Sequence, residues 1–353
     1  MSLLRDTLAG IVPADRAAPE ACRRRWDAIA KPLHSLGLLE DAVVRVAAMM
    51  GSPDVDLSRR AIVVMCADHG VVAEGVTQTG QEVTAIVTEN MSKGASSVCC
   101  MARQAHAEVV PVDIGVARPV AGAHILQRNL MRGTRNMTKG PAMDREVCVR
   151  AIETGIQVAK ELCGRGMTLL GTGEMGIGNT TASSAVAAVL LGTEPGTVTG
   201  RGAGLSSRGL DRKVEAIRRA IAVNRPDPAD PIDVLSKVGG LDLAGLTGVF
   251  LGGAACRTPV LVDGFISAAA ALCAVRLCPA AGDYLLASHV SAEPAGERML
   301  RELGLVPLLR ANMCLGEGTG TAAVMPLLDM ALAVYGQMAT FDEIEVEAYQ
   351  PLT

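Results

Sequence analysis

Six short apolar runs are the feature that most constrains the fold of this chain. Stretches of helical character separate each run from the next. Continuous runs of this length, without polar alternation, are typical of parallel strands buried on both faces. They predict a doubly wound α/β fold with a mostly parallel sheet. The runs are AIVVMCA (61–67), VVPVDIG (109–115), MTLLGTG (167–173), PVLVDG (259–264), YLLASH (284–289) and VPLLR (306–310).

Apolar residues at helical spacing predict the helices that cover the sheet and a second, smaller unit. LLEDAVVRVAAMM (38–50) shows this spacing, and residues 1–50 are expected to be helical. We expect the last helix, 319–335, to leave the sheet and join the N-terminal helices. The prediction is a large α/β domain over 56–329, with a small helical domain built from 1–55 and 330–353. Further helices are expected at 180–191, 212–223, 265–275 and 293–303.

A polar or glycine-containing turn follows each apolar run. Ligands of open α/β sheets bind at the carboxyl ends of the strands, so these turns are expected to meet at one site. The pattern favours an enzyme or a binder of small polar molecules. The turns supply Asp68-His69-Gly70, Asp113 with Gly115, Gly173-Glu174-Met175-Gly176, Asp263-Gly264, Ser288-His289 and, a few residues after the last run, Glu317.

Charge and composition argue against several other classes of protein. A net charge of -4 provides no footprint for nucleic acid or an acidic membrane surface, and 2% aromatic residues disfavour base stacking. No run of residues is a credible transmembrane span. The ten cysteines form no CxxC pair and no signal peptide precedes them, which indicates reduced thiols in a cytoplasmic protein.

The most glycine-dense turn, GTGEMGIGNTT (171–181), fits two nucleotide-binding patterns incompletely. Gly171, Gly173 and Gly176 match GxGxxG, but Glu194, at the spacing of the ribose-binding acid, has no strand before it. This leaves an NAD-dependent oxidoreductase as the alternative function.

The same turn also resembles a P-loop in which Asn179 replaces the lysine, so a nucleoside triphosphate site is not expected. Backbone N–H groups before a helix still favour an anion such as a phosphate monoester. The competing interpretation is a tight turn with Asn179 or Thr180 as an N-cap.

Four further residues each have more than one possible role. Lys213, among the basic residues after TGRGAGL (199–205), is the preferred phosphate partner, although most basic residues on such a helix are only solvated. Asp68 and His69 could bind a metal or act as an acid/base pair, but no HxxxH or HExxH pattern accompanies them, so a hydrogen-bonded His69 is expected. Asp263 could bind ribose hydroxyls or cap the helix that follows it.

Glu317 lies between two glycines in GEGTG and precedes an apolar run. Gly316 and Gly318 are expected to let the backbone approach a ligand closely. Local sequence places few charged residues nearby, which suits a general base. The alternative is a glutamate placed in the first turn of a helix because the helix dipole favours it.

The chain resembles the nicotinate-nucleotide:dimethylbenzimidazole phosphoribosyltransferases of cobalamin lower-ligand synthesis over essentially its whole length. No single glycine loop among the matching segments would be specific, but together they are. The segments are KPLHSLGLLED (31–41), ADHGVVAEGV (67–76), QEVT (81–84), VDIGV (112–116), GEMGIGNTTASSA (173–185), GRGAGL (200–205), VDGFISAAAAL (262–272) and LGEGTGTAAVMPLLD (315–329).

This resemblance implies a homodimer with a Rossmann-like large domain and a small helical domain. It implies transfer of ribose 5-phosphate from nicotinate mononucleotide to a benzimidazole-type base, with Glu317 as the general base and no metal or other cofactor. The acceptor base is expected near Gln81, Met175 and Leu315. The nucleotide phosphate and ribose are expected near Glu174, Gly176, Gly178, Asn179, Thr180, Gly202, Lys213, Asp263 and Ser291.

Two positions depart from the family pattern. Leu33-His34 replaces a Pro-Gly pair in KPPGSLG, and this change is expected to affect only a helix junction. Gly80 replaces a proline before QEVT, close to the expected base pocket, so the preferred acceptor base does not follow from the resemblance.

Overall fold

The computed structural model describes residues 2–349, and within them a six-stranded parallel sheet forms the centre of the molecule. The strand order is β3-β2-β1-β4-β5-β6, so the chain moves outward from β1 on one side and from β4 on the other. This order confirms the Rossmann-like, doubly wound fold and places its switch point between β1 and β4. The strands are β1 Arg60–Ala67, β2 Glu108–Gly115, β3 Leu126–Gln127, β4 Leu169–Met175, β5 Val260–Val262 and β6 Leu285–Ala287.

Five of the six apolar runs form strands, but the prediction for 306–310 is wrong. Leu309 makes only an isolated bridge to His289, and Val306 is 63% exposed, so this segment is not buried on both faces. The sixth strand is instead β3. A strand of two residues is too short to produce a recognisable hydrophobic pattern.

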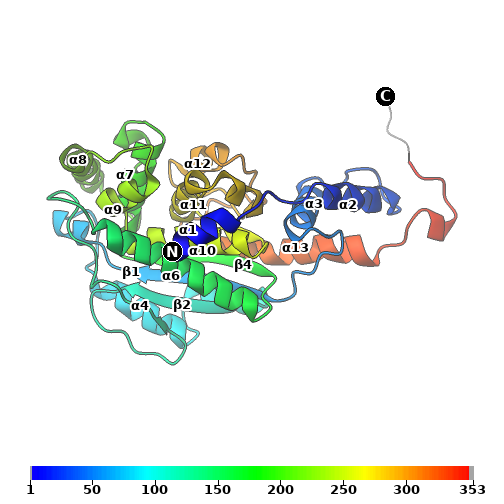
Figure 1. Ribbon diagram of the computed structural model, residues 1–353, viewed down its shortest axis with the longest axis horizontal. Coiled ribbons are helices and arrows are strands. Elements are labelled where there is room, and N and C mark those ends of the chain that lie inside the picture. Colours follow the sequence, from blue (N-terminus) through cyan, green and yellow to red (C-terminus); the bar gives the residue numbers. More distant parts are fainter. Residues whose placement is uncertain (1, 350–353) are drawn as a thin grey trace.

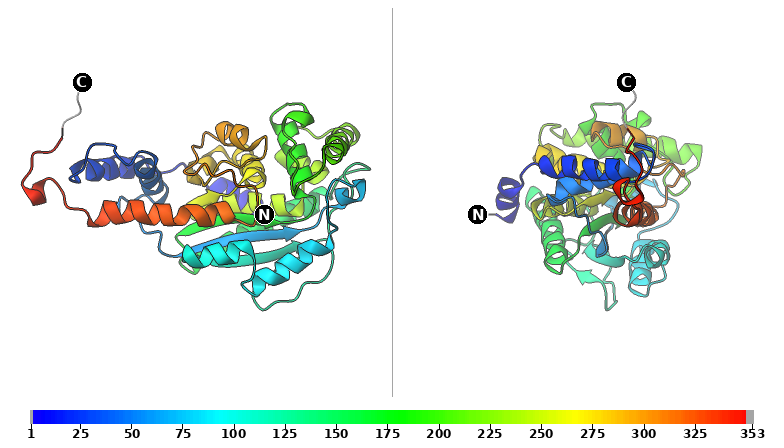
Figure 2. Two further views of the ribbon diagram at one scale, coloured as in Figure 1. Left: turned by 180° about the vertical axis from the view of Figure 1, so that it is seen from behind. Right: turned by 90° about the vertical axis from the view of Figure 1, so that its right-hand side faces the viewer.

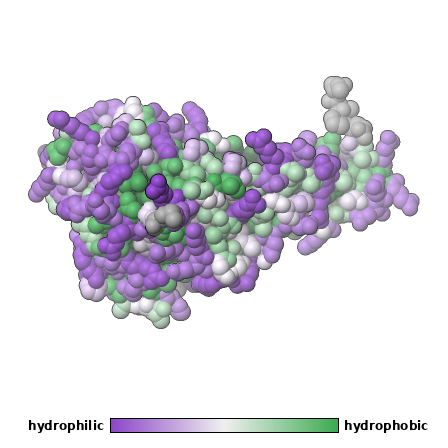
Figure 3. All heavy atoms as spheres, in the orientation of Figure 1, coloured by the Kyte–Doolittle hydropathy of each residue, from purple (hydrophilic) through white to green (hydrophobic). Residues whose placement is uncertain are grey.

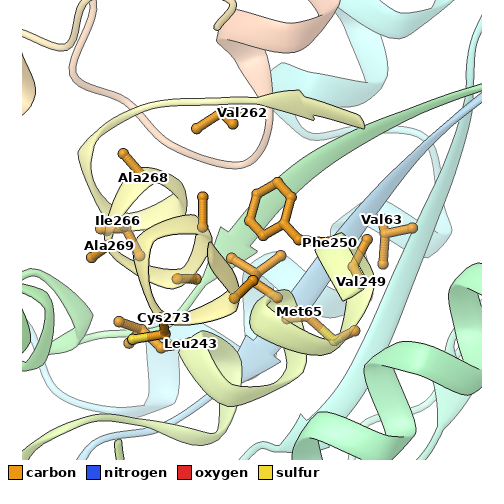
Figure 4. Close-up of a cluster of buried hydrophobic side chains, with 14 of the residues drawn as sticks. Val63, Met65, Leu243, Val249, Phe250, Val262, Ile266, Ala268, Ala269 and Cys273 are labelled. Carbon is orange, nitrogen blue, oxygen red and sulfur yellow. The ribbon is translucent and has the colours of Figure 1, made fainter. Parts of the chain in front are cut away.

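The alternating side chains of β1 explain why both faces of the sheet are covered. Val63 and Met65 lie on the side of Phe250 and its helix α10 in Figure 4. On the other face, Ile62 lies beside Gly318, directly before α13. Successive strand residues point to opposite faces, so a run buried on both sides must be apolar throughout.

The helices α6 and α10 cover the first face, and α4, α5 and the start of α13 pack on the other (Figure 1). The helix predicted at 212–223 begins earlier than expected, because α8 starts at Ser207. The Ser206 hydroxyl is its N-cap and accepts a hydrogen bond from the Gly209 N–H. The helices are α1 Leu3–Gly10, α2 Ala17–Ala28, α3 Leu38–Met50, α4 Glu82–Ser92, α5 Ser97–Gln104, α6 Arg145–Gly164, α7 Asn179–Leu190, α8 Ser207–Asn224, α9 Pro231–Val238, α10 Leu241–Ala255, α11 Phe265–Leu277, α12 Gly296–Glu302 and α13 Thr319–Gln337.

An arm made by α2, α3 and the second half of α13 projects from the α/β body (Figures 1 and 2). Trp26 and Tyr335 stack in its own apolar cluster, with ring centroids 4.9 Å apart. These contacts support a small helical unit, while its division from the large domain at residues 55 and 330 stays a prediction. Residues 350–353 of that predicted unit lie outside the described residues.

The helix α13 is the one described helix whose length and composition would suit a membrane crossing. It has 19 residues, and half of its apolar window is buried within the molecule. Such burial is typical of a core helix in a globular protein. Figure 3 shows hydrophilic residues over most of the visible body, with apolar residues scattered among them.

Candidate active site

A cavity of about 260 Å³ opens at the carboxyl end of β4, beside the switch point of the sheet. All of the predicted site residues except Gln81 line it. The turns after β4, β5 and β6 and the Glu317 turn therefore converge as expected, although the roles of the individual residues stay predictions. The expectation is wrong for the turns after β1 and β2, because Asp68, His69 and Asp113 do not line the cavity. The lining predicted residues are Glu174, Met175, Gly176, Gly178, Asn179, Thr180, Gly202, Lys213, Asp263, Ser291, Leu315 and Glu317.

The side chain of Gln81 is engaged elsewhere in the structure. Its amide donates a hydrogen bond to the His69 carbonyl oxygen at 3.1 Å. This contact joins the start of α4 to the turn after β1. Gln81 thus supports the wall of the site, and Val76, Thr77 and Val87 line the cavity on that side.

One end of the cavity is suited to an anion. Gly178, with φ +99°, precedes α7, and no side chain caps the first turn of this helix. The N-cap interpretation of Asn179 is therefore wrong, because its amide donates instead to the Glu174 carboxylate. The Asn179 and Thr181 N–H groups donate to the Gly176 and Gly178 carbonyls, so the positive end of the helix dipole is the feature that favours an anion here.

Lys213 reaches the same end of the cavity from α8. Its side chain is 1% exposed, and its Nζ donates to the Thr180 hydroxyl at 2.8 Å and to the Gly200 carbonyl at 3.1 Å. Burial lowers the pKa of Lys213 to about 8, while the Glu293 carboxylate acts in the opposite direction. Glu293 also lines the cavity, and its Oε2 is buried without a hydrogen-bond partner.

Glu317 also lines the cavity, on a turn of unusual backbone. Its own φ is +60°, and those of Gly316 and Gly318 are +90° and +92°. The turn is held because the Glu317 N–H donates to the Glu174 carbonyl at 3.2 Å. The Glu317 carboxylate accepts from the Val98 N–H of α5 at 3.0 Å, so it lies at the start of α5 and not in the first turn of α13.

The surroundings of Glu317 contain more charge than its neighbours in the sequence suggested. Burial raises the pKa of Glu174 well above its usual range, and the charges of Asp242, Asp263 and Glu317 add to this effect. Burial also raises the pKa of Asp263 to about 7, against hydrogen bonds that favour its charged form. Two carboxyl groups near Glu317 are thus shifted toward their protonated forms.

Asp263 caps a helix, but not the helix that follows it in sequence. Its Oδ1 accepts from the Gly320 N–H at 2.7 Å and from the Thr321 N–H at 3.1 Å, both in the first turn of α13. The following helix, α11, has no side-chain cap. Asp263 therefore fixes the start of α13, which the Glu317 turn leads into.

The glycines around Glu317 serve the packing of the protein on itself. A Cβ on Gly173 would lie 2.4 Å from the Glu317 carbonyl oxygen, and one on Gly316 would meet the Glu174 carboxylate. The expectation that Gly316 and Gly318 mainly admit a ligand is thus corrected. They allow positive φ and close contact with β4.

The structure also removes the physical basis of a dinucleotide fingerprint. Gly171 and Gly173 are interior residues of β4, paired with Ile62 and Val64, and not part of a phosphate-binding turn. Glu194 precedes a 3-10 helix and forms an ion pair with Arg218. The oxidoreductase alternative therefore has no support.

His69 is hydrogen-bonded inside the fold, as the sequence suggested. Its Nε2 lies 3.1 Å from Asp242 Oδ2, and burial, which would lower the pKa of His69, is outweighed by this carboxylate, which raises it. This pair packs against Gly176: a Cβ added at Gly176 would lie 3.3 Å from both side chains. Residues 2–349 contain no group of three or more His, Cys, Asp or Glu that could hold a metal ion.

Sequence reasoning missed several residues that line the cavity. His289 was named with the strand-end turns but was given no role. Phe265 could have been found from the same rule, since it follows β5 closely. No comparable signal pointed to Glu293 or to the residues just before Gln81. The missed lining residues are Val76, Thr77, Gln78, Thr79, Val87, Phe265, Ile266, Glu293 and Cys314.

The fold and the site together define a class of α/β proteins with a ligand-sized cavity at the carboxyl ends of the parallel strands. A family model described as phosphoribosyltransferase matches residues 11–346. The chain belongs to this phosphoribosyltransferase family, and it is an enzyme.

Relatives agree with this assignment over nearly the whole chain. A nicotinate-nucleotide–dimethylbenzimidazole phosphoribosyltransferase of Ruminiclostridium cellulolyticum is 47% identical over 94% of this chain and 95% of its own. One of Acetivibrio thermocellus is 46% identical over 99% of both chains. The crystal structure of CobT from Thermus thermophilus matches with a TM-score of 0.90 and 41% identity, over 95% of this chain and all of that one.

Proposed function

We propose that this enzyme transfers ribose 5-phosphate from nicotinate mononucleotide to 5,6-dimethylbenzimidazole or a related base, in the assembly of the cobalamin nucleotide loop. The products are α-ribazole 5′-phosphate and nicotinate. One observation carries the proposal: a single cavity is lined by a helix N-terminus with Lys213 and by Glu317. This arrangement suits a phosphorylated donor and an acceptor that must lose a proton.

The reaction is a direct displacement at the anomeric carbon of the ribose. An acceptor ring nitrogen forms the new bond to this carbon, and the bond to the pyridinium nitrogen breaks, so nicotinate leaves with the electron pair. The acceptor's other ring nitrogen loses its proton to Glu317. Such a base contributes about 10²- to 10⁴-fold, and alignment of the reactants about 7–11 kcal/mol at most.

The donor's phosphate is the remote anchor in this proposal. Held by the first turn of α7 and by Lys213, it would use binding energy to align the ribose. Met175 and Leu315 line the cavity near Glu317 and are proposed to contact the flat acceptor ring. Leu315 is 57% exposed, which suits a side chain that becomes covered when the acceptor binds.

The test is turnover of the two substrates by the whole chain. Nicotinate mononucleotide and 5,6-dimethylbenzimidazole should yield α-ribazole 5′-phosphate and nicotinate in equal amounts, measured by chromatography. Glu317→Gln should nearly abolish turnover and preserve mononucleotide binding, measured by calorimetry. Glu297→Gln, which alters an exposed ion pair with Arg310, is the matched control. Binding without nicotinate release would indicate a nucleotide sensor instead.

We also propose a homodimer, formed through the arm. Exposed apolar side chains near the end of the chain support this proposal, because a monomer would leave them in water. Light scattering should show the mass of two chains, and Met338→Glu should lower it. A single-chain mass for the unaltered protein would contradict the proposal. The exposed residues are Met330, Met338, Ile344, Val346 and Tyr349.

A further inference from the structure

The first turn of α5 holds the candidate base by a single backbone group. The N–H of Val98 donates to Glu317 Oε2 at 3.0 Å, across 219 positions of sequence. Val98 is the second residue of α5, where N–H groups have no partner within the helix. Ser96 caps the next such group, that of Cys99. The Glu317 carboxylate thus completes the capping of α5.

Glu174 at the end of β4 and Asp263 after β5 face the same turn as Glu317, and burial raises the pKa of both. Asp263 is also held at a helix start, because it accepts from the Gly320 and Thr321 N–H groups of α13. The Glu317 carboxylate is held from a different helix, by the Val98 N–H of α5.

We infer that the Val98 N–H is a positioning group for the reaction. It fixes Glu317 Oε2, and Oε1 is left to take the proton from the acceptor's ring nitrogen. The electron pair of that N–H bond stays on the acceptor ring as its other nitrogen attacks the ribose. This inference rests on the proposed role of Glu317 as base.

The sharpest test removes this N–H and keeps the buried side chain. Replacing Val98 by its α-hydroxy acid turns one backbone amide into an ester, which also makes the Ser97 carbonyl a weaker acceptor, so the control carries the same change. The matched control is the same replacement at Val147, in the first turn of α6 and outside the cavity. Thermal melting of both esters establishes that each is folded before kinetics are compared.

The Val98 ester should lower kcat about tenfold, the lower range for a hydrogen bond to a charged group. The KM for nicotinate mononucleotide should change less than about twofold, because the phosphate end is untouched.

A kcat equal to that of the Val147 ester would overturn the inference. A KM for nicotinate mononucleotide that rises as much as kcat falls would also overturn it, because that result indicates a merely structural role. The proposed function fails separately: in that case the unaltered protein would form no α-ribazole 5′-phosphate at all.

Discussion

Lys213→Met should separate binding of the donor's phosphate from the chemistry at the ribose. Methionine keeps much of the length and volume of the buried side chain but removes its charge and donors. The Lys213 ammonium uses two of its N–H groups on Thr180 and Gly200, so a third is free for a ligand in the cavity. We expect this group to bind the phosphate.

The size of the effect follows from that single contact. A hydrogen bond between charged groups contributes about 1.5–3 kcal/mol, so KM for nicotinate mononucleotide should rise about 10- to 150-fold. The effect on kcat should be small, because the phosphate is bound in both the ground state and the transition state. Lys237→Met, which removes a lysine paired with Asp233 in α9, should leave both constants unchanged.

The pH dependence gives a second signature of the same contact. Burial lowers the pKa of Lys213 to about 8, so the free enzyme loses this cation as pH rises through 8. Affinity for the mononucleotide should therefore fall above pH 8 in the unaltered protein, and this slope should be absent in Lys213→Met.

Steady-state kinetics with saturating acceptor and calorimetry with the mononucleotide measure these effects. Nicotinate riboside, which lacks the phosphate, should bind equally to the unaltered protein and to Lys213→Met. An equal loss of affinity for riboside and mononucleotide would refute the reasoning, because Lys213 would then support the cavity and not the phosphate.

Three other substitutions test the structure around the site. Asp263→Asn should remove part of the pH dependence of stability: burial raises the pKa of Asp263 to about 7, so the native state retains a proton that the unfolded state loses near pH 4. Between pH 4 and 7 the free energy of unfolding of the unaltered protein should therefore fall by up to about 4 kcal/mol relative to that of the variant, measured by urea unfolding. Gly173→Ala should lower kcat about 10²-fold by displacing Glu317, while Gly164→Ala, whose Cβ meets open space, should not. His34→Gly should raise the free energy of unfolding by about 0.5–1 kcal/mol, because His34 has φ +56°.

Each of these predictions can fail clearly. Parallel stability–pH curves for the unaltered protein and Asp263→Asn would show that this carboxyl does not retain its proton. Normal turnover by Gly173→Ala would mean that the Glu317 turn tolerates displacement. A less stable His34→Gly would show that the lost side chain matters more than relief of the left-handed backbone.

The sequence by itself determined the sheet and the position of the site. Apolar runs such as those of β1 and β4 are readable because burial on both faces excludes polar residues along the whole strand. Turns after strands carry the ligand-binding groups in any parallel sheet, so Glu174, Asp263 and Glu317 could be assigned to one edge in advance. The glycine turn that leads into α7 at Gly178 was readable for a similar local reason.

Only the tertiary structure decided how these groups act on one another. The sequence around Glu317 indicated few charged neighbours, yet Glu174 and Asp263 face it from other strands. Asp263 caps α13 and not the adjacent helix, and Val98 holds Glu317 from a helix 219 residues away. The physical reason is that pKa values and hydrogen bonds depend on distances in space. Strand order and helix packing set those distances between residues that are remote in the chain.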